Sequence, residues 1–475
     1  MDFLPVVLPT DGLIFLLLVT VMVFAVYVRG KEHLRAPWRE VKRSRMAAAA
    51  LVVLLTYALI GLLDSLHFRL PLADNGAAKM EAGTETEYST EVLSLLDVMA
   101  APLRARVEKT YSAPFSAYLF ARETEQRADG TEVRVFPRLK YGGRHLQDPE
   151  NERAADILVA SARAVAISLL IWLGVCAALA GLLARRERVS FSTMLRRILR
   201  GETETPWRVV LLTFFIILVV AVWAAVLSLK YHILGTDKVG QDVFYQALKS
   251  IRTGLVIGTL TTLVMLPFAV LLGIMAGYFR GVADDIIQYV YTTLSSIPGV
   301  LLIAAAILSL QVYITNHPEQ FDTLAERADL RLLFLCVILG ITSWTGLCRL
   351  LRGETLKLRE MEYIQAAQAF GVGHSKIIRR HILPNVMHIV LISVVLDFSG
   401  LVLAEAVLSY VGVGVDPSTH SWGNMINGAR LEMARDPMVW WSLCAAFVFM
   451  FTLVLAANLF SDVVRDAFDP RLRKQ

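Results

Sequence analysis

Long apolar stretches separated by short charged segments run along most of the chain. A helix needs about 20 mostly apolar residues to cross a bilayer, because only a helix satisfies its own backbone hydrogen bonds in hydrocarbon. Nine stretches meet this requirement, at residues 12–28, 46–63, 157–183, 209–228, 253–276, 287–312, 332–348, 388–412 and 438–460. The pattern therefore predicts an all-α polytopic membrane protein with about nine transmembrane helices.

Composition agrees with a membrane protein. Of 475 residues, 56% are hydrophobic and 19% are charged, and the mean hydropathy is +0.55. The net charge of +5 could suggest nucleic-acid binding, but Lys and Arg concentrate in alternate loops, as in proteins oriented by cytoplasmic positive charge. We therefore exclude nucleic acid and expect membrane lipid as a partner. The four cysteines lack C-x-x-C spacing, so neither a metal site nor a disulfide framework is predicted.

The distribution of charge predicts the orientation. Residues 29–45 hold seven basic and two acidic residues, and residues 185–208 and 349–387 each hold seven basic and three acidic ones. With nine spans all three loops fall on one side, which should be cytoplasmic. We therefore expect a periplasmic N-terminus and a cytoplasmic C-terminus.

The segment from 64 to 156 is the one long extracytoplasmic insertion. Apolar residues recur at helical spacing between 92 and 107, and two short runs, 118–122 and 133–139, flank Ala128-Asp129-Gly130 like a hairpin. A small α+β insertion is expected.

The cytoplasmic loop 349–387 has the most informative local pattern. Helix-forming residues run up to Gly371, which can adopt the left-handed conformation that ends a helix, and an amphipathic helix follows with Ile377, Ile378 and Ile382 on one face. Pro384 cannot continue that helix, so we expect it to mark where the chain re-enters the membrane. The loop should form two short helices joined by a sharp turn.

The first of these short helices is suited to docking. Ala366, Ala367 and Ala369 present almost no side chain, so another protein could approach the backbone closely, and Phe370 offers one large apolar anchor. A membrane-surface helix pair without a partner is the alternative interpretation.

This loop resembles the EAA signature of ABC importer permeases. Gln365-Ala366-Ala367, Gly371, Leu383 and Pro384 stand at the spacing of that signature, with Gln365 in place of Glu and His381 in place of Ile. The resemblance implies docking of a separate ATPase. The residues that it assigns to this contact are Glu362, Tyr363, Gln365, Ala366, Ala367, Phe370, Gly371, Leu383 and Pro384.

Further segments resemble the dipeptide, oligopeptide and nickel permeases, in the same order along the chain. The segment from His232 to Val243 is similar to an outer loop of that family, with Gln241 in place of Arg. Segments 277–281, 404–412, 421–423 and 466–471 also match, so that the resemblance covers about residues 205–475. The outer-loop residues that it singles out are Gly235, Thr236, Asp237, Gly240, Asp242, Ser421, Trp422 and Gly423.

The resemblance implies a type I ABC importer permease core in the last six helices. The expected organisation is two transmembrane helices in 1–63, the insertion in 64–156, a third helix and linker in 157–204, and the permease domain in 205–475. The implied partners are a second homologous permease, cytoplasmic ATPases that bind ATP and Mg²⁺, and a periplasmic solute-binding protein in the bacterial inner membrane system. The chain itself should bind no cofactor and no metal and should have no catalytic residues.

A few residues inside predicted spans carry candidate roles. Asp397 and Glu405 must face protein or water, since an unpaired charge there costs at least about 2.5 kcal/mol. For Asp397, a place on the translocation path and burial against another subunit fit equally well, whereas Glu405 suits a structural or gating role. Pro267 could form a hinge. The glycines Gly254, Gly258, Gly273 and Gly277 should allow close helix packing.

The expected function is ATP-driven import of di- or oligopeptides by alternating access. Import of nickel or another solute is the alternative. A membrane enzyme or sensor that uses residues 64–153 would need a nucleophile with a base, or a metal cluster, which we do not find there. A self-sufficient channel would need a polar stripe across several spans, and none is evident. No nucleotide-binding G-x-x-x-x-G-K-[ST] loop occurs, so energy must come from a partner.

Overall fold

The computed structural model describes residues 3–29, 32–71, 88–126, 132–320 and 323–468. The elements of the first 204 residues are β1 Leu4–Val6, α1 Pro9–Arg29, α2 Glu32–Arg43, α3 Arg45–Ser65, β2 His67–Arg69, β3 Leu93–Ser94, α4 Leu95–Met99, α5 Ala101–Ala105, β4 Glu123–Gln126, β5 Glu132–Val135, α6 Pro149–Glu187 and α7 Phe191–Arg200.

The remaining elements are almost entirely helical. They are α8 Trp207–Ser228, α9 Val243–Phe279, α10 Val282–Ser296, α11 Gly299–Asn316, the 3-10 turn Pro318–Gln320, α12 Leu324–Ser343, α13 Thr345–Arg359, α14 Glu362–Ala369, α15 His374–Ile377, the π-helical turn Ile378–Ile382, α16 Leu383–Val411, α17 Trp422–Glu432 and α18 Trp441–Phe468.

Eight helical stretches of the described chain are long and apolar enough to cross a membrane: Arg45–Ser65, Pro149–Glu187, Trp207–Ser228, Val243–Phe279, Gly299–Asn316, Leu324–Arg359, His374–Val411 and Trp441–Phe468. The expected first span, 12–28, falls in α1, whose apolar stretch Pro9–Val23 is shorter than the eight others. The all-α polytopic fold is confirmed.

The bounds expected for the sixth span, 287–312, were wrong. The chain is extended at Ile297 and Pro298, so α10 ends at Ser296 and α11 begins at Gly299. A proline disfavours helical conformation in the residue before it. The residues on both sides of this break are mostly apolar. Hydropathy alone therefore predicted one span where the structure has two helices.

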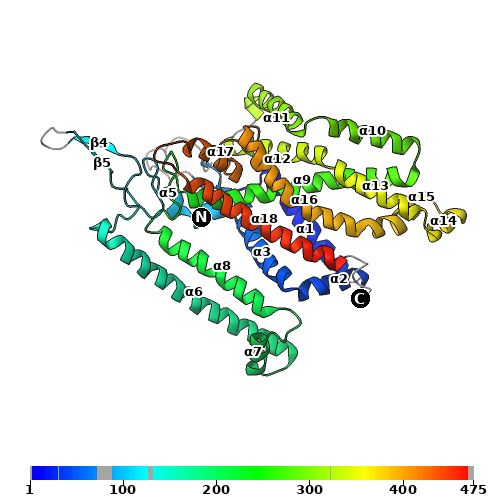
Figure 1. The fold of residues 1–475 in the computed structure, drawn as a ribbon, viewed down its shortest axis with the longest axis horizontal. Helices are drawn as coiled ribbons and strands as arrows, with labels where there is room; N and C mark the ends of the chain where they lie inside the picture. Colours follow the sequence, from blue (N-terminus) through cyan, green and yellow to red (C-terminus); the bar gives the residue numbers. More distant parts are fainter. Residues whose placement is uncertain (1–2, 30–31, 72–87, 127–131, 321–322, 469–475) are drawn as a thin grey trace, which may run out of the picture.

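Helix α9 is the central element of the bundle. It packs against α12, α13 and α16 and also against α3 from the N-terminal part (Figure 1). The four glycines expected to allow close packing lie where α9 contacts α17, α16 and α13: an added Cβ would lie 2.8 Å from Trp422 at Gly254, 2.5 Å from Phe398 at Gly258, 2.9 Å from Leu351 at Gly273 and 2.6 Å from Thr355 at Gly277. The prediction of close helix packing is confirmed. Helix α9 continues through Pro267, whose side chain is exposed.

The insertion forms a small α+β cap at one end of the bundle. Strands β1, β2 and β3 form an antiparallel sheet, to which the chain's first described residues contribute β1. Strands β4 and β5 pair antiparallel as the expected hairpin, which projects from the cap in Figure 1, although the first strand lies at 123–126 and not at 118–122. The expected tip, 128–130, lies outside the described residues. The helical repeat expected between 92 and 107 becomes α4 and α5, with a strand before them.

Helices α6 and α8 form a long antiparallel pair (Figure 1), with α7 across their far end. Helix α3 contacts α8, α9 and α18, and α2 lies against the C-terminal end of α18, where Trp38 meets Phe468 edge to face at 5.7 Å. The N-terminal third of the chain is therefore packed along the bundle.

Candidate functional site

A short helical elbow projects from the bundle between α13 and α16 (Figure 1). Helix α14 ends in a turn in which Val372 N–H donates to the Ala367 carbonyl at 3.0 Å. Gly371 has φ +72°, the left-handed value that its lack of a Cβ permits. The expected helix, sharp turn and second helix are therefore all present.

One face of the elbow is buried and the opposite face is open. Ile364, Ile377 and Ile382 are fully buried against the bundle, whereas Phe370 is 88% exposed. The other residues assigned to ATPase contact are also at least partly exposed: Glu362, Tyr363, Gln365, Ala366, Ala367, Gly371, Leu383 and Pro384. A large apolar side chain this exposed beside small residues has the character of a binding anchor.

Pro384 does not interrupt the helix, contrary to our expectation. Helix runs without a break from His374 to Val411, and the turn Ile378–Ile382, just before the proline, is π-helical. A proline lacks an N–H and its ring clashes with the carbonyl four residues earlier in an α-helix, and the wider π turn relieves this conflict. The second helix of the elbow is thus continuous with span α16.

The elbow is also hydrogen-bonded to the C-terminal end of α9. The hydroxyl of Tyr278 lies 2.8 Å from Nδ1 of His374, and Gln368 Nε2 donates to the same hydroxyl at 3.4 Å. Arg280 pairs with Glu360. Two separate helices, α9 and α16, are therefore held to the elbow.

A second pair braces the helices next to the elbow. The guanidinium of Arg352 in α13 makes two bonds, of 2.6 and 2.7 Å, to the carboxylate of Asp284 in α10. The α15 end of the elbow has an open groove of about 570 Å³, which is lined by Gly373, Ser375, Lys376, Arg379 and Arg380. Three of these residues are basic, so this part of the elbow surface is basic.

At the other end of the bundle, the outer-loop segment 232–242 forms a compact turn. Gly235 and Gly240 have φ of +69° and +77°. Asp237 Oδ1 accepts hydrogen bonds from the N–H groups of Val239 and Gln241, each at 2.9 Å, and Asp242 caps α9. The residues singled out here are structural in this arrangement.

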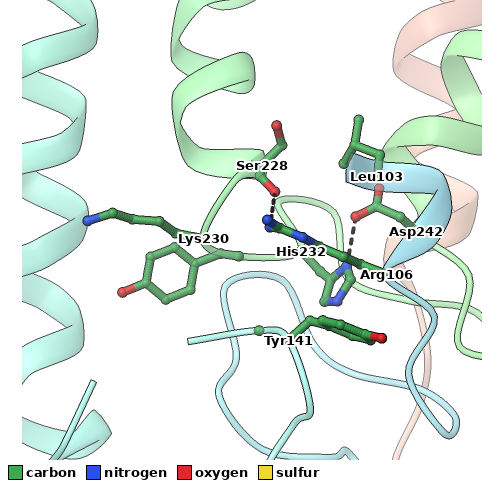
Figure 2. A pocket seen from close by; sticks show the side chains of 9 residues that line it. Leu103, Arg106, Tyr141, Ser228, Lys230, His232 and Asp242 are labelled. Carbon is green, nitrogen blue, oxygen red and sulfur yellow. Dashed lines mark hydrogen bonds and ion pairs between the residues drawn. The ribbon is translucent and has the colours of Figure 1, made fainter. Parts of the chain in front are cut away.

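The insertion covers this turn. Backbone hydrogen bonds join Ser112 to Thr236, Phe115 to His232 and Glu108 to Gly240, and a Cβ at Gly240 would lie 1.9 Å from the Glu108 carbonyl oxygen. Figure 2 shows the narrow crevice at this junction, where Arg106 points toward the Ser228 carbonyl, at 3.1 Å. The insertion is therefore docked on the outer loop through specific backbone contacts.

A buried histidine sits between two carboxylates at this junction. His232 Nδ1 lies 2.8 Å from Asp242 (Figure 2), and its Nε2 lies 3.3 Å from Glu108. Burial by itself lowers the pKa of His232, but the two carboxylates outweigh it and raise the pKa to about 9. Burial raises the pKa of Glu108, but His232 and three backbone N–H groups lower it to about 2. Both groups are therefore charged at neutral pH.

Comparison with known proteins identifies the family. The model of a family described as binding-protein-dependent transport system inner membrane component matches residues 269–474. A glutathione transport system permease of Pectobacterium atrosepticum is 33% identical over 51% of this chain and 73% of its own length. An oligopeptide transport system permease of Mycobacterium tuberculosis is 32% identical over 51% of this chain and 77% of its own. The chain belongs to this permease family.

Other relatives are more distant. A dipeptide transport system permease of Bacillus subtilis is 28% identical over 51% of this chain and 70% of its own length. A solved structure of the MetNI methionine ABC transporter in an inward-facing conformation is 18% identical over 46% of this chain and 93% of its own, with a TM-score of 0.35. The permease is a multi-pass membrane transport subunit and not an enzyme, and its family implies ATPase and solute-binding partners.

Two other segments that resemble the permease family, 404–412 and 421–423, contact each other. Ser409 Oγ donates to Glu405 Oε1 at 2.7 Å, and a Cβ at Gly423 would lie 2.6 Å from the same oxygen. Trp422 is buried and donates to the Ala247 carbonyl at 3.2 Å. Glu405 is only 2% exposed, which favours its structural role.

The structure does not gather the other intramembrane candidates into one site. Asp397 is half-buried in α16, and none of its contacts with described residues is an ion pair or hydrogen bond. Pro267 is exposed on α9. Their roles on the translocation path stay predictions.

Sequence analysis missed a buried charge network in the permease. Arg252 of α9 donates to Asp11 of α1 at 2.6 Å, to Thr10 at 2.9 Å and to Asp329 of α12 at 3.3 Å. These residues are at most 9% exposed. The network joins the first helix to two helices of the permease domain.

A second cation, which is partly buried, lies one turn earlier on α9. Lys249 Nζ pairs with Asp64, the last acidic residue of α3, at 2.5 Å and with Asp97 of the insertion at 3.0 Å. Tyr245 also donates to Asp97, at 2.6 Å. One signal could have found both groups: acidic residues stand at the predicted outer ends of the first two spans, and the basic residues begin the apolar run of the fifth.

Proposed function

We propose that this chain is a pore-forming subunit of an ATP-driven importer of di- or oligopeptides. The relatives reported above are named for glutathione, oligopeptides and dipeptides, and none of them for nickel. In this proposal a second homologous permease completes the pore, a periplasmic protein delivers the solute, and cytoplasmic ATPases bind ATP and Mg²⁺.

The structure of the elbow supports the proposed coupling between the ATPases and the membrane spans. Its open face presents Phe370, its second helix is continuous with α16, and His374 is hydrogen-bonded to Tyr278 of α9. A partner that pushes on α14 would move two spans together, because both are attached to the same short element. Alternating access then follows from rigid movement of these helices.

The proposed orientation places the elbow in the cytoplasm and the cap in the periplasm. The basic excess of residues 29–45, 185–208 and 349–387 supports it. In addition, Tyr111 of the insertion donates to Glu432 at 3.2 Å. These two segments were assigned to the same side of the membrane by the charge count.

Cysteine labelling in the assembled transporter tests this proposal. Cysteine placed at Ala367 or Phe370 should react with reagents only from the cytoplasmic side and should crosslink to the ATPase subunit. Thr124, exposed on the cap hairpin, serves as the matched control and should react only from the periplasm. Labelling of Ala367 from the periplasm, or a lack of crosslinks to any ATPase, would contradict the proposal.

The substrate class needs its own experiment. Uptake of labelled di- and oligopeptides by cells with the full transporter should fall when Phe370 is replaced by alanine, while the amount of chain in the membrane stays constant. Nickel uptake should not depend on the transporter. Peptide uptake that is unaffected by deletion of the chain would overturn the assignment of substrate.

A further inference from the structure

The far end of the α6 and α8 pair carries an unusual cluster of arginines. Between residues 185 and 208 the chain has seven arginines, no lysine and three glutamates. All seven arginines are exposed. The seven positions are Arg185, Arg186, Arg188, Arg196, Arg197, Arg200 and Arg208.

The acidic residues of this segment are already engaged. Glu187 pairs with Arg197 at 3.4 Å, and Glu202 lies 4.0 Å from Arg200. Glu204 pairs at 2.8 Å with Arg43 of α2, outside the cluster. Five guanidinium groups of this segment consequently have no acidic partner within 4.0 Å among the described residues.

Helix α7 holds this cluster against the ends of two membrane spans (Figure 1). Met194 is fully buried and Ile198 is 3% exposed, and both pack with Ala184 of α6 and Leu211 of α8. The helix is capped by Ser190 and ends at Gly201, which has φ +75°. The loop is therefore an ordered platform, fixed at the level where α6 ends and α8 begins.

Apolar side chains are exposed around the same platform. Phe191 and Leu199 of α7 are 46% and 63% exposed. Leu182 in the last turns of α6 and Leu212 near the start of α8 are 65% and 56% exposed. Arginine next to exposed apolar residues at the end of a span suits the boundary between headgroups and acyl chains.

We propose that α7 and the adjoining turn form a binding site for anionic phospholipid headgroups. Guanidinium groups bind phosphate oxygens in a bidentate manner, which lysine cannot do. The exposed leucines and Phe191 would contact the acyl chains of the same lipids. This site would anchor the α6 and α8 pair, where the N-terminal extension joins the permease domain, to the membrane surface, independently of the solute that the transporter moves.

Native mass spectrometry of the full-length chain tests the proposal. The chain is released from nanodiscs that contain equal amounts of phosphatidylglycerol and phosphatidylcholine, and the retained lipids are counted. One variant neutralises the cluster with Arg185→Gln, Arg186→Gln, Arg188→Gln and Arg196→Gln. The matched control neutralises four exposed arginines of the cap and the opposite end of α6, with Arg122→Gln, Arg134→Gln, Arg144→Gln and Arg153→Gln.

We expect the cluster variant to lose its preference for phosphatidylglycerol, by about fivefold for each arginine that contacts a headgroup. The control should keep the preference of the unmodified chain. Equal retention by the cluster variant and the unmodified chain would overturn the proposal. Displacement of the lipid by inorganic phosphate alone would assign the site to free phosphate and overturn it as well.

A photo-crosslinker at Leu199 distinguishes lipid from a protein partner. In membranes that contain the assembled transporter, the proposal expects adducts with phospholipid. Adducts with another protein subunit in place of lipid would show that α7 is a protein interface and would contradict the proposal.

Discussion

Asp11 and Arg252 form a buried ion pair, with Oδ1 of Asp11 2.6 Å from Nη2 of Arg252. Asp11 lies in the first turn of α1, and Arg252 lies on α9 of the permease domain, 241 residues later. The Asp11 side chain is fully buried, and the Arg252 side chain is 10% exposed. The N-terminal extension is therefore held to the permease domain by an ion pair whose two side chains are almost completely shielded from water.

Removal of Asp11 should destabilise the protein strongly. Asp11→Asn would leave Arg252 buried with only part of its compensating charge, and loss of one partner of a buried pair costs about 3 to 5 kcal/mol. We expect a lower free energy of unfolding in detergent solution, measured by denaturant titration. Glu204→Gln, which removes the exposed pair with Arg43, should have almost no effect. Equal stability of the two variants would contradict a structural role for the buried pair.

The stability of the junction between the insertion and the outer-loop segment 232–242 should fall at both acidic and alkaline pH. The raised pKa of His232, about 9 against 6.5 in the unfolded chain, means that its stabilisation is complete below about 6.5 and is lost as pH rises through about 9. The lowered pKa of Glu108, about 2 against 4.5, means that its stabilisation is present above about 4.5 and is lost as pH falls through about 2.

The replacement Glu108→Gln tests this dependence. It should reduce the loss of stability in acid and move the alkaline loss to lower pH, because His232 would keep only Asp242 as an acidic partner. The apparent melting temperature as a function of pH gives the readout. Glu123→Gln, which affects a partly exposed pair with Lys109, should leave the profile unchanged. Superimposable profiles for the unmodified chain and Glu108→Gln would rule out the proposed ion pairs.

Two glycines of α17 should respond in opposite ways to alanine. A Cβ at Gly423 would lie 2.6 Å from Glu405 Oε1 and 3.0 Å from the Ala406 Cα, so Gly423→Ala should cost about 1 to 3 kcal/mol by overpacking. At Gly428 no neighbouring atom lies within 4 Å, and alanine there should stabilise the helix by up to about 1 kcal/mol. Denaturant titration measures both. A Gly423→Ala variant as stable as Gly428→Ala would show that α16 and α17 are less closely packed than described.

Asp397 offers a test of the translocation path. If its carboxylate meets the solute, Asp397→Asn should lower peptide uptake by about tenfold, the factor that corresponds to 1.4 kcal/mol of lost interaction. Uptake is compared at equal amounts of membrane-inserted chain. Asp462→Asn, at an exposed position near the end of α18, is the control and should transport normally. Unchanged uptake by Asp397→Asn would remove this residue from the path.

Much of the fold could be predicted because its signals are local. Apolar length identified the spans, and Gly371 followed by a second amphipathic run identified the elbow. Where a proline occurs within or beside an apolar run, the sequence did not determine whether the helix ends there. Pro298 breaks an apolar run into α10 and α11, whereas Pro384 is accommodated by a π turn within a continuous helix. The same residue type ended a helix in one place and not in the other: the chain is extended before Pro298, whereas a π turn precedes Pro384.

By itself the amino-acid sequence determined the membrane class, the spans, the elbow and the resemblance to the permease family. Only the tertiary structure decided that the N-terminal extension is built into the permease domain, through Arg252 with Asp11 and Lys249 with Asp64. Hydropathy and motif spacing report on neighbours along the chain. Ion pairs across 241 and 185 residues depend on which helix ends meet at the same depth, and that is settled by packing.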